Sequence, residues 1–371
     1  MKTQLKNNLS KKIEGLPTFN IVVSDGRREG VLFANGNMQL GIVINIQATT
    51  DNYDEEVKLS DEQLNSIELV NKITGEKLSS EWSYSSEEND YLHQFPQQGL
   101  TENTNLSPDE IDSFNNKPEA QKKIYWLKTT AIETIEIIAR VTLDGKTFLS
   151  DDEHGKGSHI SVTGRKEIIY HANGLVRQTE KNVANGTYKC KVTTVEPGGP
   201  FVSPRTVIEF EDLEWIQDNH YIYINDSYNF SVHDVDIKNT INDNDISRYD
   251  YRRFTHHTKD DQLYLWFLWG KYKAKRTAGA DYQSKKDYFS DSGISITREA
   301  TPQVEIDTTP RTDVVSLSRL YFKKPINNFW VDEANQVPQF KFRDIYGNES
   351  VWLKIIMDVS DSENEFHLQE G

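Results

Sequence analysis

The stretch MQLGIVINIQA, Met38 to Ala48, decides the fold class. Leucine and isoleucine occupy every second position in its centre, at Leu40, Ile42, Ile44 and Ile46. Successive side chains of a β-strand lie on opposite faces, so this alternation predicts a strand with one buried face. Similar runs occur at 134–143, 219–226 and 351–359, rich in β-branched and aromatic residues. The dominant pattern of the chain is therefore that of β-sheets.

Turn residues separate these runs where hairpins need them. Asp144-Gly145 and Gly347-Asn348 each stand between two predicted strands, as a tight hairpin loop requires. The tripeptide Ala-Asn-Gly occurs three times, around Asn35, Asn173 and Asn185. Because asparagine and glycine tolerate positive φ, we predict that these copies are hairpin turns as well.

Helix signals are few and short. Ser60 with Gln63 forms a capping-box pattern, and Ser107-Pro108 resembles a helix start. Strands do not alternate with long helices, which excludes the doubly wound and barrel α/β folds. The prediction is an all-β protein of two tandem β-sandwich (Ig-like) domains, residues 15–160 and a larger domain 161–371, with short helical turns on the connections.

The stretch from Ala34 to Asp61 resembles the start of bacterial Ig-like modules of the invasin–intimin kind. The Ala34-Asn35-Gly36 turn, the strand 38–48 and the Asp51-Asn52 loop carry the resemblance, which covers about thirty residues. Further along, LSDEQLNSIEL replaces the strand expected in that family. The resemblance implies a sandwich fold and, for the family, spacer or adhesion modules on a surface.

Composition limits the classes of partner and compartment. The net charge of −16 over 371 residues argues against nucleic-acid binding, because phosphates repel such a surface. The one cysteine, Cys190, allows no intrachain disulfide, and its place in an alternating run predicts a small buried side chain. The first residues carry lysines without an apolar segment, unlike a secretory signal. We therefore expect synthesis in the cytoplasm, with release by lysis, by injection or within a particle.

Motifs for catalysis are missing from the sequence. It has no Gly-x-Ser-x-Gly elbow, phosphate-binding glycine loop or His-Glu-x-x-His zinc pattern, and the pairs His154/His159 and His256/His257 lack further ligands at zinc spacing. We therefore predict a protein that is not an enzyme and holds no cofactor. Paired carboxylates of a glycan-active enzyme need no local motif, so that alternative stays open.

The most unusual segment is LYLWFLWGKYKAKR, residues 263–276, where aromatic side chains precede basic ones. Its candidate binding residues are Tyr264, Trp266, Trp269, Tyr272, Lys271, Lys273, Lys275 and Arg276. One interpretation is a central strand buried on both faces, followed by a basic loop. Alternatively, the side chains contact a membrane interface, a glycan, an acidic partner or a neighbouring subunit. Buried indoles would exclude the membrane and the glycan.

A second candidate site lies in HDVDIKNTINDND, where Asp234, Asp236, Asp243 and Asp245 could supply oxygen ligands to Ca²⁺. The glycine and glutamate of an EF-hand loop are missing, and such clusters in β-proteins also serve as solvated turns.

From these observations we predict a non-catalytic β-sandwich protein that acts by surface recognition, as a binding protein, an adhesin or a structural component of a released toxin or phage-like assembly. Its partner would be a protein or glycan surface, or a membrane, and it could form an oligomer or particle. The alternatives are a membrane-active toxin that uses segment 263–276 and a glycan-binding or glycan-active protein.

Overall fold

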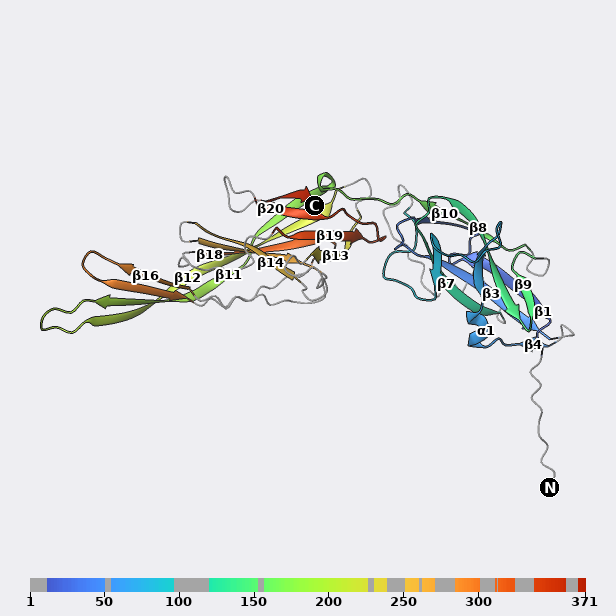
Figure 1. Cartoon of the computed structure of the whole chain (residues 1–371), viewed down its shortest axis with the longest axis horizontal. Helices are drawn as coiled ribbons and strands as arrows, with labels where there is room; N and C mark the ends of the chain where they lie inside the picture. The colour runs from blue at the N-terminus through green and yellow to red at the C-terminus, as the bar shows by residue number, and fades with distance from the viewer. Residues whose placement is uncertain are drawn as a thin grey trace, which may run out of the picture. The chain divides into compact units, whose positions relative to one another are not determined.

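The computed structural model describes residues 12–50, 55–96, 120–152, 157–225, 230–238, 251–259, 262–270, 284–300, 311, 313–323, 337–357 and 366–371. The regular secondary structure of these residues is almost entirely strand (Figure 1), which confirms the all-β prediction. By its contacts the chain divides into two compact units, residues 1–168 with 346–348 and residues 169–345 with 349–371. In the described part of the chain, no helix has the length and apolar character needed to cross a bilayer.

The first unit contains two five-stranded sheets. One has the order β1 (Gly15–Val23), β3 (Leu40–Thr49), β7 (Gln121–Thr129), β6 (Trp82–Ser85), with β4 (Glu56–Val57) also paired to β3. The other has the order β2 (Glu29–Phe33), β10 (Ile160–Arg165), β8 (Thr134–Leu143), β5 (Glu68–Asn71), with β9 (Lys146–Leu149) also paired to β8. Only β2 and β10 pair in parallel among these described strands.

Strand β3 departs from the prediction of one buried face. Its residues are buried on both faces, and only Gln47 is half-exposed. The reason is its central position between β1 and β7, where Asn45 is also buried and donates a hydrogen bond to Asn20. The apolar positions Ile42, Ile44 and Ile46 have no exposed surface.

Local turn and cap signals are confirmed in the first unit. Asp144 and Gly145 join β8 to β9 with φ of 49° and 83°, as a type I′ hairpin loop requires. Ser60 caps the short helix α1 (Asp61–Asn65), and Gln63 completes the capping box. The Ser107 segment lies outside the described residues.

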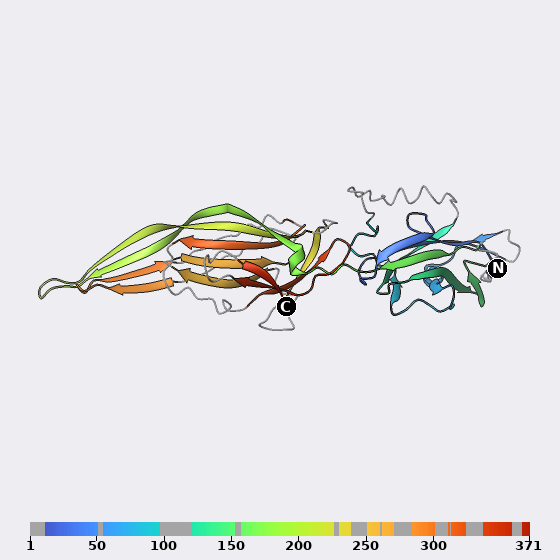
Figure 2. The same cartoon turned by 90° about the horizontal axis from the view of Figure 1, so that it is seen from above.

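The second unit contains a seven-stranded and a four-stranded sheet, both antiparallel. The large sheet has the order β14 (Tyr251–Lys259), β15 (Gln262–Trp269), β18 (Val315–Lys323), β12 (Arg205–Ile224), β11 (Leu175–Glu196), β17 (Ser295–Ala300), β16 (Ser284–Phe289). The small sheet has the order β13 (Val232–Lys238), β19 (Gln339–Asp344), β20 (Leu353–Met357), β21 (Phe366–Glu370). Figure 2 shows β11 and β12 side by side along their whole length.

The prediction that the Ala-Asn-Gly copies are hairpin turns is wrong. Asn35 joins β2 in one sheet to β3 in the other, and its side chain accepts bonds from the backbone N–H groups of Asn37 and Met38. Asn173 lies in the 3₁₀ turn η1 (Ala172–Gly174), and Asn185 lies inside β11. There the missing side chain of Gly186 leaves room for the indole of Trp215 on β12, since a Cβ would lie 2.7 Å from Nε1.

Candidate binding surface on the distal arm

The aromatic part of the segment 263–276 is strand β15, which lies between β14 and β18. Tyr264, Trp266 and Trp269 are all buried, and the indole N–H of Trp269 donates to the Ser318 hydroxyl at 2.9 Å. The interpretation of a central strand buried on both faces is confirmed. The two indoles therefore cannot contact a membrane or a sugar in this structure.

The remaining residues of that candidate site, Lys271, Tyr272, Lys273, Lys275 and Arg276, lie outside the described residues. Their proposed contact with an acidic partner stays a prediction.

Two of the candidate Ca²⁺ ligands instead bind an arginine. Asp234 and Arg343 are register partners on β13 and β19, with an O–N distance of 2.7 Å, and Asp236 lies 2.9 Å from the same guanidinium. Glu349 contacts its Nε at 2.8 Å. Asp243 and Asp245 lie outside the described residues. Over the described ranges, no group of three or more metal-ligating side chains comes together.

Cys190 has the surroundings that its sequence position predicts. It is buried in β11, and burial raises the pKa of its thiol, which keeps the thiol protonated at neutral pH. The side chain is therefore a packing element of the sheet.

A buried polar cluster that sequence analysis did not single out lies in β12. His220 stacks on Trp266 with ring centroids 4.9 Å apart, and its Nδ1 lies 2.9 Å from the Thr179 hydroxyl. Burial and the positive charge of Arg319 lower the pKa of His220 to about 4, so the ring is neutral at physiological pH. Asp218 forms an ion pair with Arg319 beside it.

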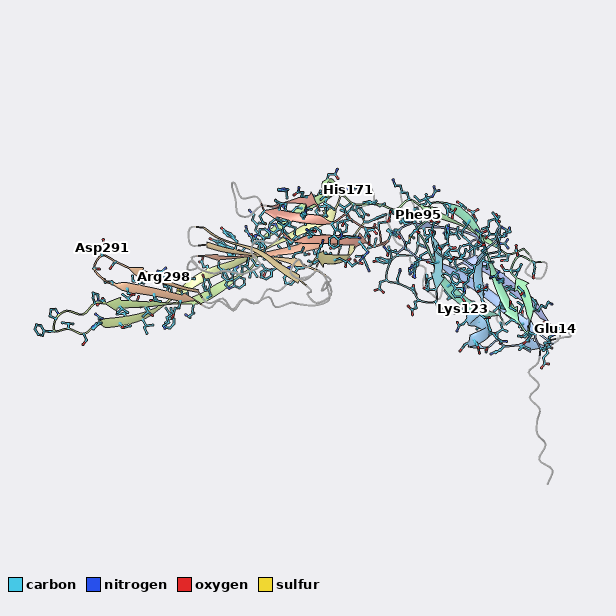
Figure 3. All side chains as sticks on the ribbon, viewed as in Figure 1. Glu14, Phe95, Lys123, His171, Asp291 and Arg298 are labelled. Carbon is cyan, nitrogen blue, oxygen red and sulfur yellow. The ribbon has the colours of Figure 1, made fainter. Side chains whose placement is uncertain are left out.

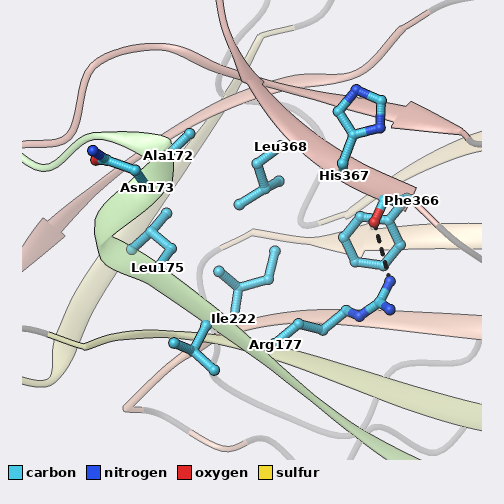
Figure 4. A pocket seen from close by; sticks show the side chains of 9 residues that line it. Ala172, Asn173, Leu175, Arg177, Ile222, Phe366, His367 and Leu368 are labelled. Atoms are coloured by element: carbon cyan, nitrogen blue, oxygen red, sulfur yellow. Dashed lines mark hydrogen bonds between the residues drawn. The ribbon is translucent and has the colours of Figure 1, made fainter.

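Next to this cluster lies an open pocket of about 390 Å³ (Figure 4). It is lined by Ala172, Asn173, Leu175, Val176, Arg177, Ile222, Phe366, His367 and Leu368. The guanidinium of Arg177 lies over the Phe366 ring and donates to the Phe366 carbonyl at 3.1 Å. None of the described residues that line the pocket is a carboxylate.

The feature that stands out on the surface is the far end of the β11–β12 hairpin, which we call the distal arm, residues 187–214. Strand β18 pairs with β12 only from Trp215 to Ile222, so the hairpin continues beyond it. The arm is held by continuous pairing of Thr187–Glu196 with Arg205–Glu214 and by β17, which pairs with Cys190–Val195. Asp291 and Arg298 mark the β16–β17 hairpin on this side of the arm (Figure 3).

Large apolar side chains are exposed in the turn and along strand β12 of this arm. Phe201 is fully exposed, and Val202, Ile208 and Phe210 have exposed fractions of 69%, 54% and 64%. The turn EPGGPFVSP that carries Phe201 needs glycine at Gly198, where a Cβ would lie 2.1 Å from the Val202 carbonyl oxygen. The tight turn thus presents two apolar side chains to solvent, and exposed apolar groups that gather in this way mark interaction sites.

Ion pairs neutralise several acidic residues on and beside the arm, but none of the described ion pairs includes Glu209. Lys189 pairs with Asp212, Lys191 with Glu299, and Arg298 with Glu211, at N–O distances of 2.8, 3.3 and 3.2 Å. Glu209 is exposed between Ile208 and Phe210, and no described cation lies within ion-pair distance of it. The outer edge of the arm is therefore apolar with a negative charge in its centre.

The Pro/Gly cluster at 196–204 is typical of a loop, but it does not indicate which strands the loop joins. The signal for the arm was present in the alternation of 187–195 and 205–213. The missing information was that these two runs pair with each other and extend beyond the neighbouring strand.

Comparisons with known proteins give little. No family model matches the chain, and the curated proteins give no significant match. Similar solved structures include the C-terminal domain of the antigen I/II-family protein AspA of Streptococcus pyogenes, at 10% identity over 92% of this chain and 98% of that one, with a TM-score of 0.18. Another is the C-terminal domain of the Streptococcus agalactiae AgI/II polypeptide BspA, at 9% identity over 95% and 99% of the two chains, also with a TM-score of 0.18. Neither a common fold nor a function follows from likeness at this level.

Proposed function

We propose that this chain is a non-catalytic binding protein and that the distal arm is its recognition element. The observation that carries the proposal is the exposure of Phe201 and Val202 in the turn of one hairpin and of Ile208 and Phe210 on its strand β12. Aromatic side chains at such positions are frequent anchors of protein interfaces, because each buries a large area on contact.

The partner that best fits the arm is a protein surface. An anionic membrane would be repelled by Glu209, which has no described cation within ion-pair distance. Contact with a protein requires a complementary apolar pocket. Because backbone pairing already orders the arm, binding there loses little conformational entropy.

The experiment is a selection of phage-displayed random linear peptides on the purified full chain. The selected clones are then tested on the double variant Phe201→Ser/Val202→Ser and on the control Ile73→Ser, which removes an equally exposed apolar side chain outside the arm. We expect a loss of about a hundredfold in affinity for the double variant and no change for the control, because two buried apolar side chains contribute that much.

Two outcomes would overturn the proposal. One is a set of clones that bind the double variant as well as the unaltered chain. The other is binding of the chain to phosphatidylglycerol vesicles that is lost in the double variant, which would favour a membrane-active protein instead.

A further inference from the structure

The outer edge of β12 in the distal arm has no neighbouring strand among the described residues. Strand β11 pairs with one edge from Arg205 to Glu214, whereas β18 reaches the other edge only at Trp215. Backbone N–H and C=O groups along an unpaired edge are ready to accept another strand. The edge between Thr206 and Leu213 is thus eight residues long, enough for a strand of ordinary length.

Proteins commonly block such an edge with charged side chains, lysine above all, with proline or with a bulge, and this edge carries the acidic residues Glu209, Glu211 and Asp212. From Thr206 to Leu213 the sequence has neither proline nor lysine, and the register with β11 is continuous over this stretch. The one irregularity of the β11–β12 pairing lies between Glu180 and Ala184, nearer the base of the hairpin. Among the described residues, this edge of β12 therefore has no bulge and no partner strand.

The side chains along this edge specify a complementary pattern. Ile208 and Phe210 are exposed on one face, and Glu209 lies between them on the opposite face. The neighbouring acids are already compensated, because Glu211 pairs with Arg298 and Asp212 with Lys189. A strand placed against this edge would complement Ile208, Glu209 and Phe210 if it carried an apolar, a basic and an apolar residue in succession.

We propose that the open edge of β12 accepts an extended partner strand that carries a basic side chain between two apolar ones. This rests on the proposed function and specifies its partner, and the binding mode is addition of a strand to the large sheet. A second copy of this chain is a poorer occupant, since two β12 edges centred on Glu209 would bring two carboxylates together.

The test uses a fluorescent peptide with a central Val-Lys-Val triplet flanked by serine and threonine, and a counterpart with Val-Glu-Val. Affinities are measured for the full chain and for Glu209→Lys, with Asp291→Lys as a control that makes the same charge change on the β16–β17 turn. We expect Glu209→Lys to weaken binding of the Val-Lys-Val peptide about tenfold and to strengthen binding of the Val-Glu-Val peptide, while Asp291→Lys changes neither.

Strand addition has a further signature. Methylation of alternate backbone nitrogens of the Val-Lys-Val peptide gives two versions, and only one of them has its methyl groups toward β12. We expect one version to lose binding and the other to bind like the parent. Equal binding of both versions, or no preference for lysine over glutamate, would overturn the proposal.

These results are separable from the test of the arm's tip. Phe201→Ser/Val202→Ser leaves the edge from Thr206 to Leu213 intact, so it should keep peptide binding within about twofold. If the double variant no longer binds the phage clones and the unaltered chain does not bind the Val-Lys-Val peptide, the proposed function stands and strand addition is rejected. Self-association in sedimentation that Ile208→Ser abolishes, without peptide binding, would show that a second copy occupies the edge.

Discussion

Strand β15 and the distal arm carry similar apolar side chains in opposite surroundings. Trp266 and Trp269 of β15 are buried, whereas Phe201 and Phe210 of the arm are exposed. The difference lies in what covers the faces of the strands, because Phe366 of the small sheet packs against Trp266, whereas the rings of Phe201 and Phe210 are exposed. The same kind of side chain therefore stabilises the fold in one region and is available to a partner in the other.

The largest expected effect is on stability in β15. Replacing Trp266 by alanine should cost about 3–5 kcal/mol of unfolding free energy, because it leaves a cavity and removes the stacking on His220. Urea unfolding followed by circular dichroism measures the change. A cost below about 1 kcal/mol would show that this region is not the core that its burial indicates.

His220 should make stability depend on pH. Its folded-state pKa of about 4 lies below the ordinary value of 6.5, so the unfolded chain binds the proton more readily. The stabilisation is present above pH 6.5 and is lost as the pH falls toward 4, by roughly 3 kcal/mol in total.

The unfolding free energy is measured across this pH range for the unaltered chain and for His220→Gln. The difference between the two profiles gives the contribution of His220, because the carboxylates titrate in both proteins. Identical pH profiles for the two proteins would contradict the assignment.

A smaller effect is expected at Ser318, whose hydroxyl accepts from Trp269 and donates to Asn219. Ser318→Ala leaves two buried polar groups without this partner and should cost about 1–3 kcal/mol. Thermal unfolding gives the measurement, and the exposed Ser292→Ala on the β16–β17 turn is a matched control that should leave the midpoint unchanged.

The smallest effect is expected on the arm. Phe210→Ala removes an exposed ring and should alter the unfolding free energy by no more than about 0.5 kcal/mol. The same denaturant experiment applies. A large loss would mean that Phe210 packs in the folded monomer, and the contrast with Trp266 would fail.

Local signals in the sequence predicted the local structure well. The Asp144-Gly145 hairpin and the Ser60 cap form as expected because each depends on residues close in the sequence. A central strand buried on both faces was one of the interpretations that the apolar run at 263–269 allowed, and residues 264–269 are buried. The copies of Ala-Asn-Gly were misread, since the same three residues fit a crossover, a 3₁₀ turn and a strand interior.

The candidate site was the least predictable part. Alternation in 187–195 and 205–213 is consistent with strands in any environment, and it does not say which strands become neighbours. Asp234 and Asp236 likewise have the composition of a metal site, but the pairing of β13 with β19 places Arg343 beside them.

The sequence by itself determined that this is a β-protein with an acidic surface, because side-chain alternation, turn residues and charge are local or additive properties. Only the tertiary structure decided which aromatic residues are buried and which edge has no partner strand among the described residues. Burial depends on strands that are far apart in the sequence, and their pairing ends at Trp215 on one side of β12 but continues to Arg205 on the other.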